Sequence, residues 1–270
     1  MKRVLTAVVL MAVLWIVIKR MPPIVFFGLV ALGIAVACWE CYRLFEARGD
    51  RPFAALGIAA SVALAWSFLG APPAFDPVLP LAVATALSFA AAMSRREDPD
   101  RMLRSAAGTL VPLLLIGLGL AFLVGLRSLP GDDGTDPLVL LLVCVICSDT
   151  AAFYVGTTLG RRRLAPTLSP RKTWEGAIGG VAASVGGALV AHFWFYQRLS
   201  LPHALALGVL IAVAGIGGDL AESAIKRAAG RKDSSGLLPG HGGILDRADS
   251  LLLAAPVLYY YYRAFLGTGP

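Results

Sequence analysis

The run from Ser223 to Asp249 lies between two apolar segments and holds the side chains best suited to chemistry. Its 27 residues include three acids, five cations, one histidine and five glycines. If the preceding apolar segment continues as a helix, four polar residues recur every three or four positions and share one face: Asp219, Glu222, Ser223 and Lys226. Asp246 and Asp249 repeat the three-residue interval where the last apolar segment begins. The spacing therefore predicts two small groups of polar side chains.

Carboxylates without neighbouring cysteines or a histidine cluster favour a hard cation, so these acids predict Mg²⁺ rather than zinc. Together with lysines and arginines they indicate phosphoryl or nucleotidyl transfer, in which cations neutralise phosphate charge. Glycines such as Gly242 and Gly243 would let the backbone approach a ligand closely. His241, among them, is either a donor to phosphate or a turn residue.

Two further polar groups interrupt apolar surroundings. Asp149 lies about 16 Å along a helix that starts at Leu138, near the middle of a bilayer, where an acid faces a partner or a watery cavity. It serves either function or structure. Arg171 and Lys172 stand just before Glu175, which we expect to open a helix, and so they form a candidate phosphate site.

Composition fixes the class of protein that must position these residues. Hydrophobic residues make up 57% of the 270 residues, charged residues 15%, and the mean hydropathy is +0.74. These values exclude an ordinary soluble domain and predict an all-α, polytopic membrane protein. The two CxxC pairs lie in or beside apolar segments, where this spacing serves packing better than metal binding.

Nine apolar segments are expected to span the membrane: 4–20, 23–39, 53–69, 77–93, 106–126, 138–159, 175–196, 202–220 and 245–266. The first is short for a full span, and no small-residue cleavage site follows it, so we interpret it as a retained anchor. We expect residues 1–105 to form an N-terminal group of helices and residues 106–270 to form the catalytic domain.

Orientation follows from the basic residues, because lysine and arginine favour the cytosolic side. With nine spans and a cytosolic N-terminus, cytosolic segments hold 19 of the 24 basic residues. The loops 160–174 and 221–247 are then both cytosolic. The net charge of +7 thus indicates topology and contact with anionic lipids. Nucleic acid is not expected as a partner, since aromatic residues do not alternate with the basic ones.

The polar segments resemble the signature of the phosphatidate cytidylyltransferases, also called CDP-diacylglycerol synthases. The matching positions in the polar run are Ser223, Lys226-Arg227, Lys232-Asp233, Pro239, His241-Gly242-Gly243, Asp246-Arg247 and Asp249. The upstream matches are Ser148-Asp149-Thr150, the run Ser169 to Gly176, and Gly218-Asp219 with Glu222-Ser223. The similarity covers about residues 138–256, and the N-terminal third matches only as generic spans.

The resemblance implies a Mg²⁺-dependent enzyme of the bacterial inner membrane that forms CDP-diacylglycerol and pyrophosphate from CTP and phosphatidic acid. It also implies a homodimer and leaves room for a second, monovalent cation. The acids assigned to metal are Asp149, Asp219 and Asp246; the catalytic residues are Asp219, Lys226, Asp246 and Asp249. The residues assigned to phosphate and nucleotide are Ser169, Arg171, Lys172, Ser223, Arg227, Lys232, His241 and Arg247.

Two other functions are compatible with parts of this pattern. A CTP-dependent lipid kinase would use the same chemistry but transfer the γ-phosphate, for example to a polyprenol. An ion transporter would carry paired broken helices in two similar halves. Here the polar residues gather in the C-terminal half instead, which favours the cytidylyltransferase.

Overall fold

The computed structural model describes residues 15–70, 74–129, 134–237 and 242–267, and nearly all of its regular structure is helical. Residues 15–20 are helical, and the rest of the first expected span lies outside the described residues. The other elements are α2 (Pro23–Ala47), α3 (Ala54–Ser67), α4 (Val78–Ser94), α5 (Pro99–Pro112), η1 (Leu113–Leu118), α6 (Gly119–Arg127), α7 (Thr135–Thr158), β1 (Arg163–Ala165), β2 (Ser169–Thr173), α8 (Trp174–Trp194), α9 (Leu201–Ala228), α10 (Leu245–Ala248), α11 (Leu251–Tyr261) and η3 (Tyr262–Leu266).

The apolar helices confirm the class of protein. Within the described residues, five helices are long and apolar enough to cross a membrane: Pro23–Ala47, Pro99–Arg127, Thr135–Thr158, Trp174–Trp194 and Leu201–Ala228. Helices α3 and α4, with 14 and 17 residues, are apolar but shorter. At 1.5 Å per residue they fall below the hydrocarbon thickness of about 30 Å. The number of nine spans therefore stays a prediction.

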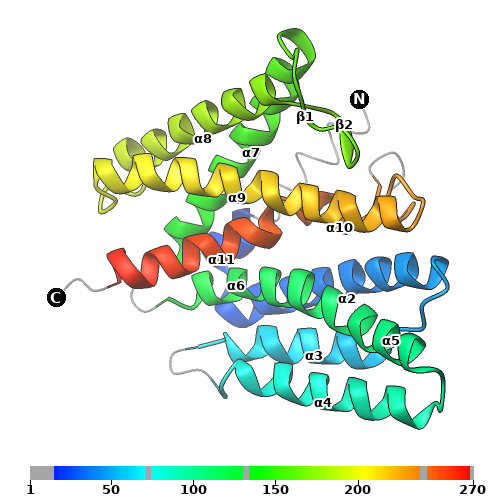
Figure 1. Ribbon diagram of the computed structural model, residues 1–270. Helices are drawn as coiled ribbons and strands as arrows, with labels where there is room; N and C mark the ends of the chain where they lie inside the picture. The colour runs from blue at the N-terminus through cyan, green and yellow to red at the C-terminus, as the bar shows by residue number, and fades with distance from the viewer. Residues whose placement is uncertain (1–14, 71–73, 130–133, 238–241, 268–270) are drawn as a thin grey trace. The chain divides into compact units, whose positions relative to one another are not determined.

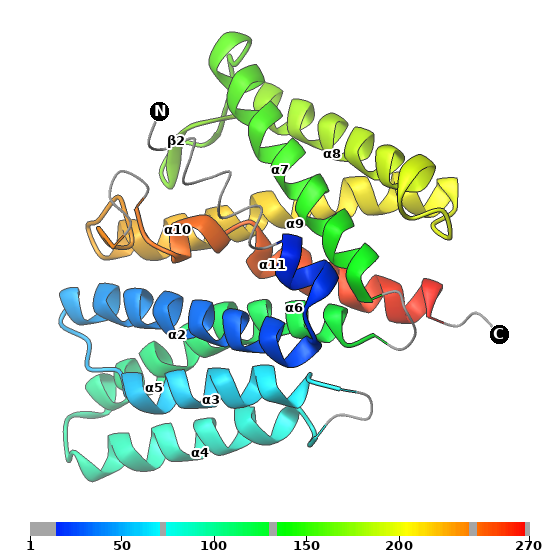
Figure 2. The same cartoon turned by 180° about the vertical axis from the view of Figure 1, so that it is seen from behind.

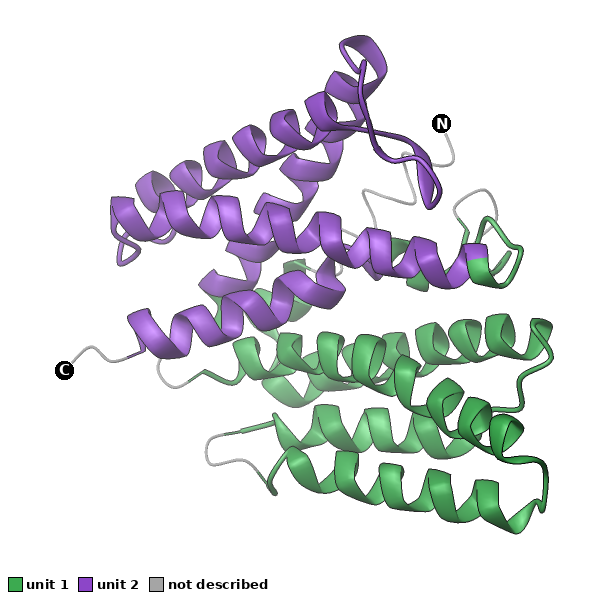
Figure 3. Ribbon diagram, viewed as in Figure 1, with its two compact units in different colours: residues 1–135, 228–247 green, residues 136–227, 248–270 purple. Residues whose placement is uncertain are grey.

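The chain forms two compact units (Figure 3). Unit 1 comprises residues 1–135 and 228–247, and unit 2 comprises residues 136–227 and 248–270. Residues 228–247, most of the polar run, thus join the N-terminal helices. The division into domains at residue 105 is a functional one and stays a prediction.

In unit 1, α3 lies between α2 and α4 and contacts both (Figures 1 and 2). The helix that follows is α-helical up to Pro112, π-helical over Leu113–Leu118 and α-helical again. Proline lacks a backbone N–H and cannot join the regular ladder, which accounts for the irregular turn there. Tyr42 on α2 donates to the Thr109 carbonyl oxygen at 2.9 Å, so the buried helices share a polar contact as well as apolar packing.

In unit 2, the loop before α8 is an antiparallel hairpin, with Arg163 paired to Thr173 and Ala165 to Ser169. The sequence interpretation expected only a turn at Ser169-Pro170, because strands this short leave no alternating pattern. The helix start expected at Glu175 is confirmed within one residue: Thr173 caps α8 by accepting a hydrogen bond from the Gly176 N–H at 3.1 Å.

The last expected span is interrupted. Helix α10 ends at Ala248 and α11 begins at Leu251, so Asp246 and Asp249 do not share one continuous helix, contrary to the spacing argument. Between the helices the Ser250 N–H donates to the Asp249 carboxylate at 2.7 Å, which satisfies a donor that a continuous helix would use in its ladder.

Candidate active site

Three carboxylates of unit 2 converge. Asp219 and Glu222 come from successive turns of α9, and Asp249 comes from the turn between α10 and α11. One oxygen from each lies within 4.8 Å of the other two. Glu222 is fully buried, whereas Asp219 and Asp249 are half-buried. The group thus combines one buried acid with two that are partly exposed to solvent.

Glycines on α9 explain how Asp249 reaches this place. A Cβ atom at Gly218 would overlap the carbonyl oxygen of Asp249, and one at Gly215 would touch Ser250 at 3.5 Å. Because both positions lack a side chain, the turn at residues 249–250 packs directly on the helix backbone. The carboxylate of Asp249 is thereby held beside the first acid of α9.

Two lysines neutralise part of the negative charge. The Lys172 ammonium lies 2.5 Å from an Asp219 carboxylate oxygen, and the Lys226 ammonium lies 2.5 Å from one of Glu222. Lys172 stands at the end of strand β2, next to the buried Thr173 that caps α8, so the hairpin fixes its position. Lys226 follows Glu222 by four residues, an interval that brings side chains together on a helix.

Asp149 on α7 belongs to the same group. The Ser250 hydroxyl lies 3.3 and 3.2 Å from its two oxygens, and the carboxylate also interacts electrostatically with Asp219 and Lys172. Ser250 follows Asp249 directly, so the same turn supplies the carboxylate of Asp249 and the hydroxyl group that contacts Asp149. On depth alone the sequence interpretation left Asp149 open between function and structure, and it assigned this acid to metal with the family resemblance.

The donor set fits a divalent cation. Four carboxylates, those of Asp149, Asp219, Glu222 and Asp249, face two ammonium groups, which leaves two negative charges formally uncompensated among the residues named. The ligand atoms offered by these residues are carboxylate oxygens, which suit Mg²⁺, whereas zinc is typically held by sulfur and imidazole nitrogen. Asp219, Glu222 and Asp249 could therefore hold Mg²⁺.

Other residues assigned to phosphate lie around this cluster or on the hairpin. The Ser223 hydroxyl lies 3.4 Å from Asp219, and Arg227 donates from its side chain to the Leu168 carbonyl oxygen at 3.0 Å. On β2, Ser169 is half-buried and Arg171 is exposed. The exposed arginine presents its charge to solvent, where a phosphate could reach it.

Three of the predicted residues that the structure describes belong to unit 1. Lys232 and Arg247 are exposed. One carboxylate oxygen of Asp246 accepts hydrogen bonds from the Ser234 N–H at 3.0 Å, the Ser234 hydroxyl at 2.7 Å and the Gly243 N–H at 2.8 Å. The assignment of Asp246 to metal stays a prediction, and His241 lies outside the described residues.

The sequence interpretation did not assign two acids that the structure places in buried polar groups. Glu222 was recognised on the polar face of α9 but given no role. Glu40 was overlooked, although an acid inside the apolar helix α2 is a signal in itself, because charge is costly there. It lies in unit 1 and is fully buried.

Comparison with known proteins gives consistent matches. A sequence profile described as the cytidylyltransferase family matches residues 1–265. A phosphatidate cytidylyltransferase of Brucella suis is 45% identical over 151 residues, which are 53% of this chain and 53% of that protein. The match thus spans about half the length of that relative. Proteins with the same name are 32% identical in Thermotoga maritima (71% of this chain, 72% of theirs) and 34% identical in Synechocystis (87% of both).

Proposed function

The chain belongs to the cytidylyltransferase family, and on this premise we propose that it transfers CMP from CTP to phosphatidic acid, giving CDP-diacylglycerol and pyrophosphate. The observation that carries the proposal is the cluster of Asp219, Glu222 and Asp249 with Lys172 and Lys226 paired to two of the acids. This combination of hard ligands and fixed cations suits a reaction between two phosphate groups.

The reaction needs no strong general base. An oxygen of the lipid phosphate attacks the α-phosphorus of CTP, the bond from that phosphorus to the bridging oxygen breaks, and pyrophosphate leaves with the electron pair. The attacking phosphate is already largely ionised at neutral pH, since the second pKa of a phosphomonoester is about 6. The acids of the site are therefore more useful as metal ligands than as proton acceptors.

We assign roles on this basis. Asp219, Glu222 and Asp249 would hold Mg²⁺, with Asp149 as a further ligand. Asp246, in unit 1, keeps its sequence-based assignment to metal. When bound, the ion supplies positive charge at the reacting phosphates. Lys172 and Lys226 balance phosphate charge from the protein side. The wider set that holds the triphosphate and the lipid phosphate comprises Ser169, Arg171, Ser223, Arg227, Lys232, His241 and Arg247.

The cellular setting is part of the proposal. Five apolar helices long enough to cross a membrane support an integral membrane enzyme, whose lipid substrate comes from the same bilayer. The distribution of basic residues supports catalytic loops on the cytosolic side of the inner membrane. A homodimer follows from the family resemblance, which also leaves room for a second, monovalent cation.

The test is to give purified protein phosphatidic acid, Mg²⁺ and CTP labelled at either the α- or the γ-phosphate. Label from the α-position entering lipid, with γ-label released as pyrophosphate, is the expected result. Label from the γ-position in lipid would show a lipid kinase instead. An Asp219→Asn variant is the matched control, since it removes one ligand oxygen charge without changing side-chain size. If neither label enters lipid with the intact protein, the proposed function is wrong.

A further inference from the structure

Glu40 is an acid in an otherwise apolar stretch of helix α2, and its side chain has no contact with solvent. A carboxylate so placed is unfavourable unless hydrogen bonds replace its hydration. The replacement comes from residues 194 to 205 positions later in the chain, all of them in unit 1. The chemistry of the N-terminal helices is thus linked to the polar run, although the sequence interpretation assigned no site residue to those helices.

Three donors and one shared hydroxyl surround the two oxygens of Glu40. The Ser235 hydroxyl donates at 2.5 Å and the Ile244 N–H at 3.1 Å to one oxygen. The Ser234 hydroxyl at 3.2 Å and the Leu245 N–H at 2.8 Å approach the other. An ionised carboxylate has acceptor sites only, which suits the two fixed N–H groups and the Ser235 hydroxyl. The single hydrogen of the Ser234 hydroxyl is shared with Asp246, the nearer acceptor. Hydrogen bonds to a charged acceptor are also stronger than neutral ones.

The surrounding backbone is shaped to admit this carboxylate. A Cβ atom at Gly243 would overlap both Glu40 oxygens and the Ser234 hydroxyl oxygen. Gly242 has φ of +76°, a value that favours glycine. The two glycines of the signature are therefore needed for different purposes. Gly242 permits the backbone bend, and Gly243 permits the approach of Glu40.

The same contacts reach a predicted site residue. Ser234 lies between the two acids, with its hydroxyl oxygen 2.7 Å from Asp246 and 3.2 Å from Glu40. The N–H groups of Ser234 and Gly243 donate to Asp246 as well. Glu40 and Asp246 thus hold two stretches of the polar run: residues 234–235 and residues 243–245.

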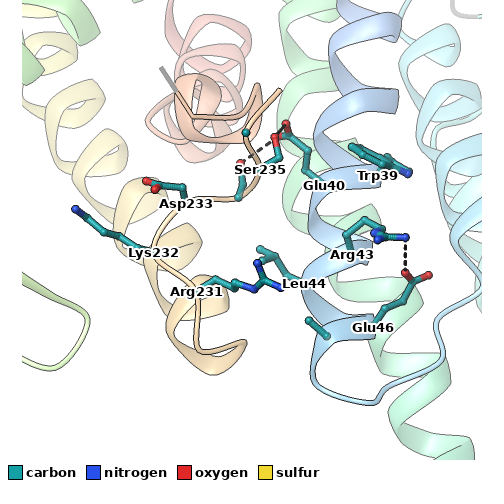
Figure 4. Close-up of a pocket in the computed structure, with 12 residues that line it drawn as sticks. Trp39, Glu40, Arg43, Leu44, Glu46, Arg231, Lys232, Asp233 and Ser235 are labelled. Atoms are coloured by element: carbon teal, nitrogen blue, oxygen red, sulfur yellow. Dashed lines mark hydrogen bonds and ion pairs between the residues drawn. The ribbon is translucent and has the colours of Figure 1, made fainter. Parts of the chain in front are cut away.

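A cavity of about 760 Å³ borders this arrangement. Residues 39–47 of α2 form one wall, and residues 231–236 form the other (Figure 4). Figure 4 shows Ser235 joined to Glu40 across this space, while Lys232 and Asp233 extend away from α2. Because Ser234 and Ser235 are tied to Glu40, the side chain of Glu40 sets the distance between the two walls.

We infer that Glu40 is a positioning residue: its buried carboxylate holds residues 234–235 and 243–245 in place and thereby orients Asp246 and the cations Lys232 and Arg247. This inference rests on the proposed function for its catalytic consequence, but the clamp itself does not. Loss of the acceptor would loosen the two stretches while the apolar helices of unit 1 stay packed.

Hydrogen–deuterium exchange of the full-length protein in detergent tests the clamp without any assay of activity. In Glu40→Gln, an NH2 group, which donates hydrogen bonds, replaces one of the two acceptor oxygens. The amides of residues 243–246 should then exchange about tenfold faster or more, the size expected when a hydrogen bond to a charged group is lost. Peptides from α3 should be unchanged. Glu97→Gln is the control, since Glu97 belongs to the same unit and has an exposed ion pair with Arg51 at 3.2 Å.

Two results would overturn the inference: unchanged exchange at residues 243–246 in folded Glu40→Gln, or faster exchange throughout α3 as well, which would indicate a general structural role. A Glu40→Asp variant separates acceptor capacity from size. Aspartate keeps both acceptor oxygens, whereas glutamine keeps the length, so protection should be better retained in the aspartate variant. The reverse order would show that volume matters and would also contradict the inference.

The catalytic consequence is measured separately. If the wild-type protein transfers CMP, Glu40→Gln should lower the rate about tenfold or more, Glu40→Asp should retain more activity, and Glu97→Gln should match the wild type. Full activity of Glu40→Gln despite faster local exchange would refute the positioning role. An inactive wild type with the expected exchange pattern would instead refute the proposed function and leave the clamp intact.

Discussion

Asp219 and Glu222 each have a lysine at 2.5 Å, so the acids of the site are already partly neutralised by the protein. A cation placed among the carboxylates would compete with these ammonium groups for the same oxygens. The lysines could then turn toward phosphate, because an ammonium on a flexible stem keeps its charge while it changes partner. The residues thus suit a site whose charges rearrange when substrate and metal arrive.

Changing Asp219 to Asn or Glu222 to Gln should raise the Mg²⁺ concentration needed for half-maximal activity and lower the maximal rate. Each change keeps the size of the side chain but removes a charged ligand oxygen. A Mg²⁺ titration of each variant measures the effect. Asp100→Asn is the control, since Asp100 is exposed and forms an ion pair with Arg104 at 2.8 Å. Unchanged half-saturation in both variants would contradict the assignment to metal.

Changing Lys172 to Met should weaken the binding of CTP with little effect on the Mg²⁺ requirement. The side chain offers charge and hydrogen-bond donors but no lone pair for a metal. We expect the KM for CTP to rise about tenfold, comparable with the loss of one hydrogen bond between charged groups. Initial rates over a range of CTP concentrations, at saturating Mg²⁺, provide the measurement. A KM equal to that of the wild type would show that Lys172 serves the carboxylates alone.

The sequence predicts one half of this residue pattern better than the other. The helical interval correctly brought Glu222 and Lys226 together, because residues four apart on a helix always neighbour each other. It failed for Asp246 and Asp249, where the helix breaks between them. Glu40 could not be placed at all, since its partners are 194 to 205 positions away and nothing local marks them.

At the scale of elements, helix α9 and the turn after α10 depend on each other. The turn approaches the helix backbone at Gly215 and Gly218, and this approach carries Asp249 to the acids of α9. Local propensity would favour alanine at both positions, because glycine weakens a helix by about 1 kcal/mol. The close approach of the turn gives the physical reason for glycine there.

Changing Gly218 to Ala should therefore displace the turn and impair the site. The new methyl group would overlap the Asp249 carbonyl oxygen, and overpacking of this kind costs about 1–3 kcal/mol. Gly217→Ala is the matched control, since its Cβ would meet only a Leu253 methyl at 3.4 Å within the described surroundings. Thermal unfolding in detergent and a Mg²⁺ titration test both variants. Equal behaviour of the two would show that the contact at Gly218 does not position Asp249.

At the scale of the whole molecule, hydropathy predicts the helices because lipid demands paired backbone groups in every span. Eight of the nine expected segments coincide with helical elements, and the first lies mostly outside the described residues. The sequence did not predict that residues 228–247 join the N-terminal unit. That association depends on contacts such as those of Glu40, which join distant parts of the chain and leave no periodic pattern.

The orientation of the chain provides the last prediction. Of the 24 basic residues, 19 lie in the five segments that nine spans would place on one side of the membrane. Because basic residues favour the cytosolic side, this bias predicts that the loops 160–174 and 221–247 face the cytosol. Single cysteines at Arg162 and Leu237, both exposed, should react with a membrane-impermeant reagent in inside-out vesicles and not in sealed right-side-out vesicles.

A cysteine at Arg198, in a segment expected outside, should show the opposite pattern and serves as the control. The native cysteines are first replaced, three of them being buried and one half-buried. Opposite accessibility at positions 162 and 237 would contradict a shared cytosolic site, because one enzyme cannot draw CTP from both sides of a sealed membrane. The same labelling at all three positions would instead place Arg198 on the side of the two loops. The segments 175–196 and 202–220 would then not each cross the membrane.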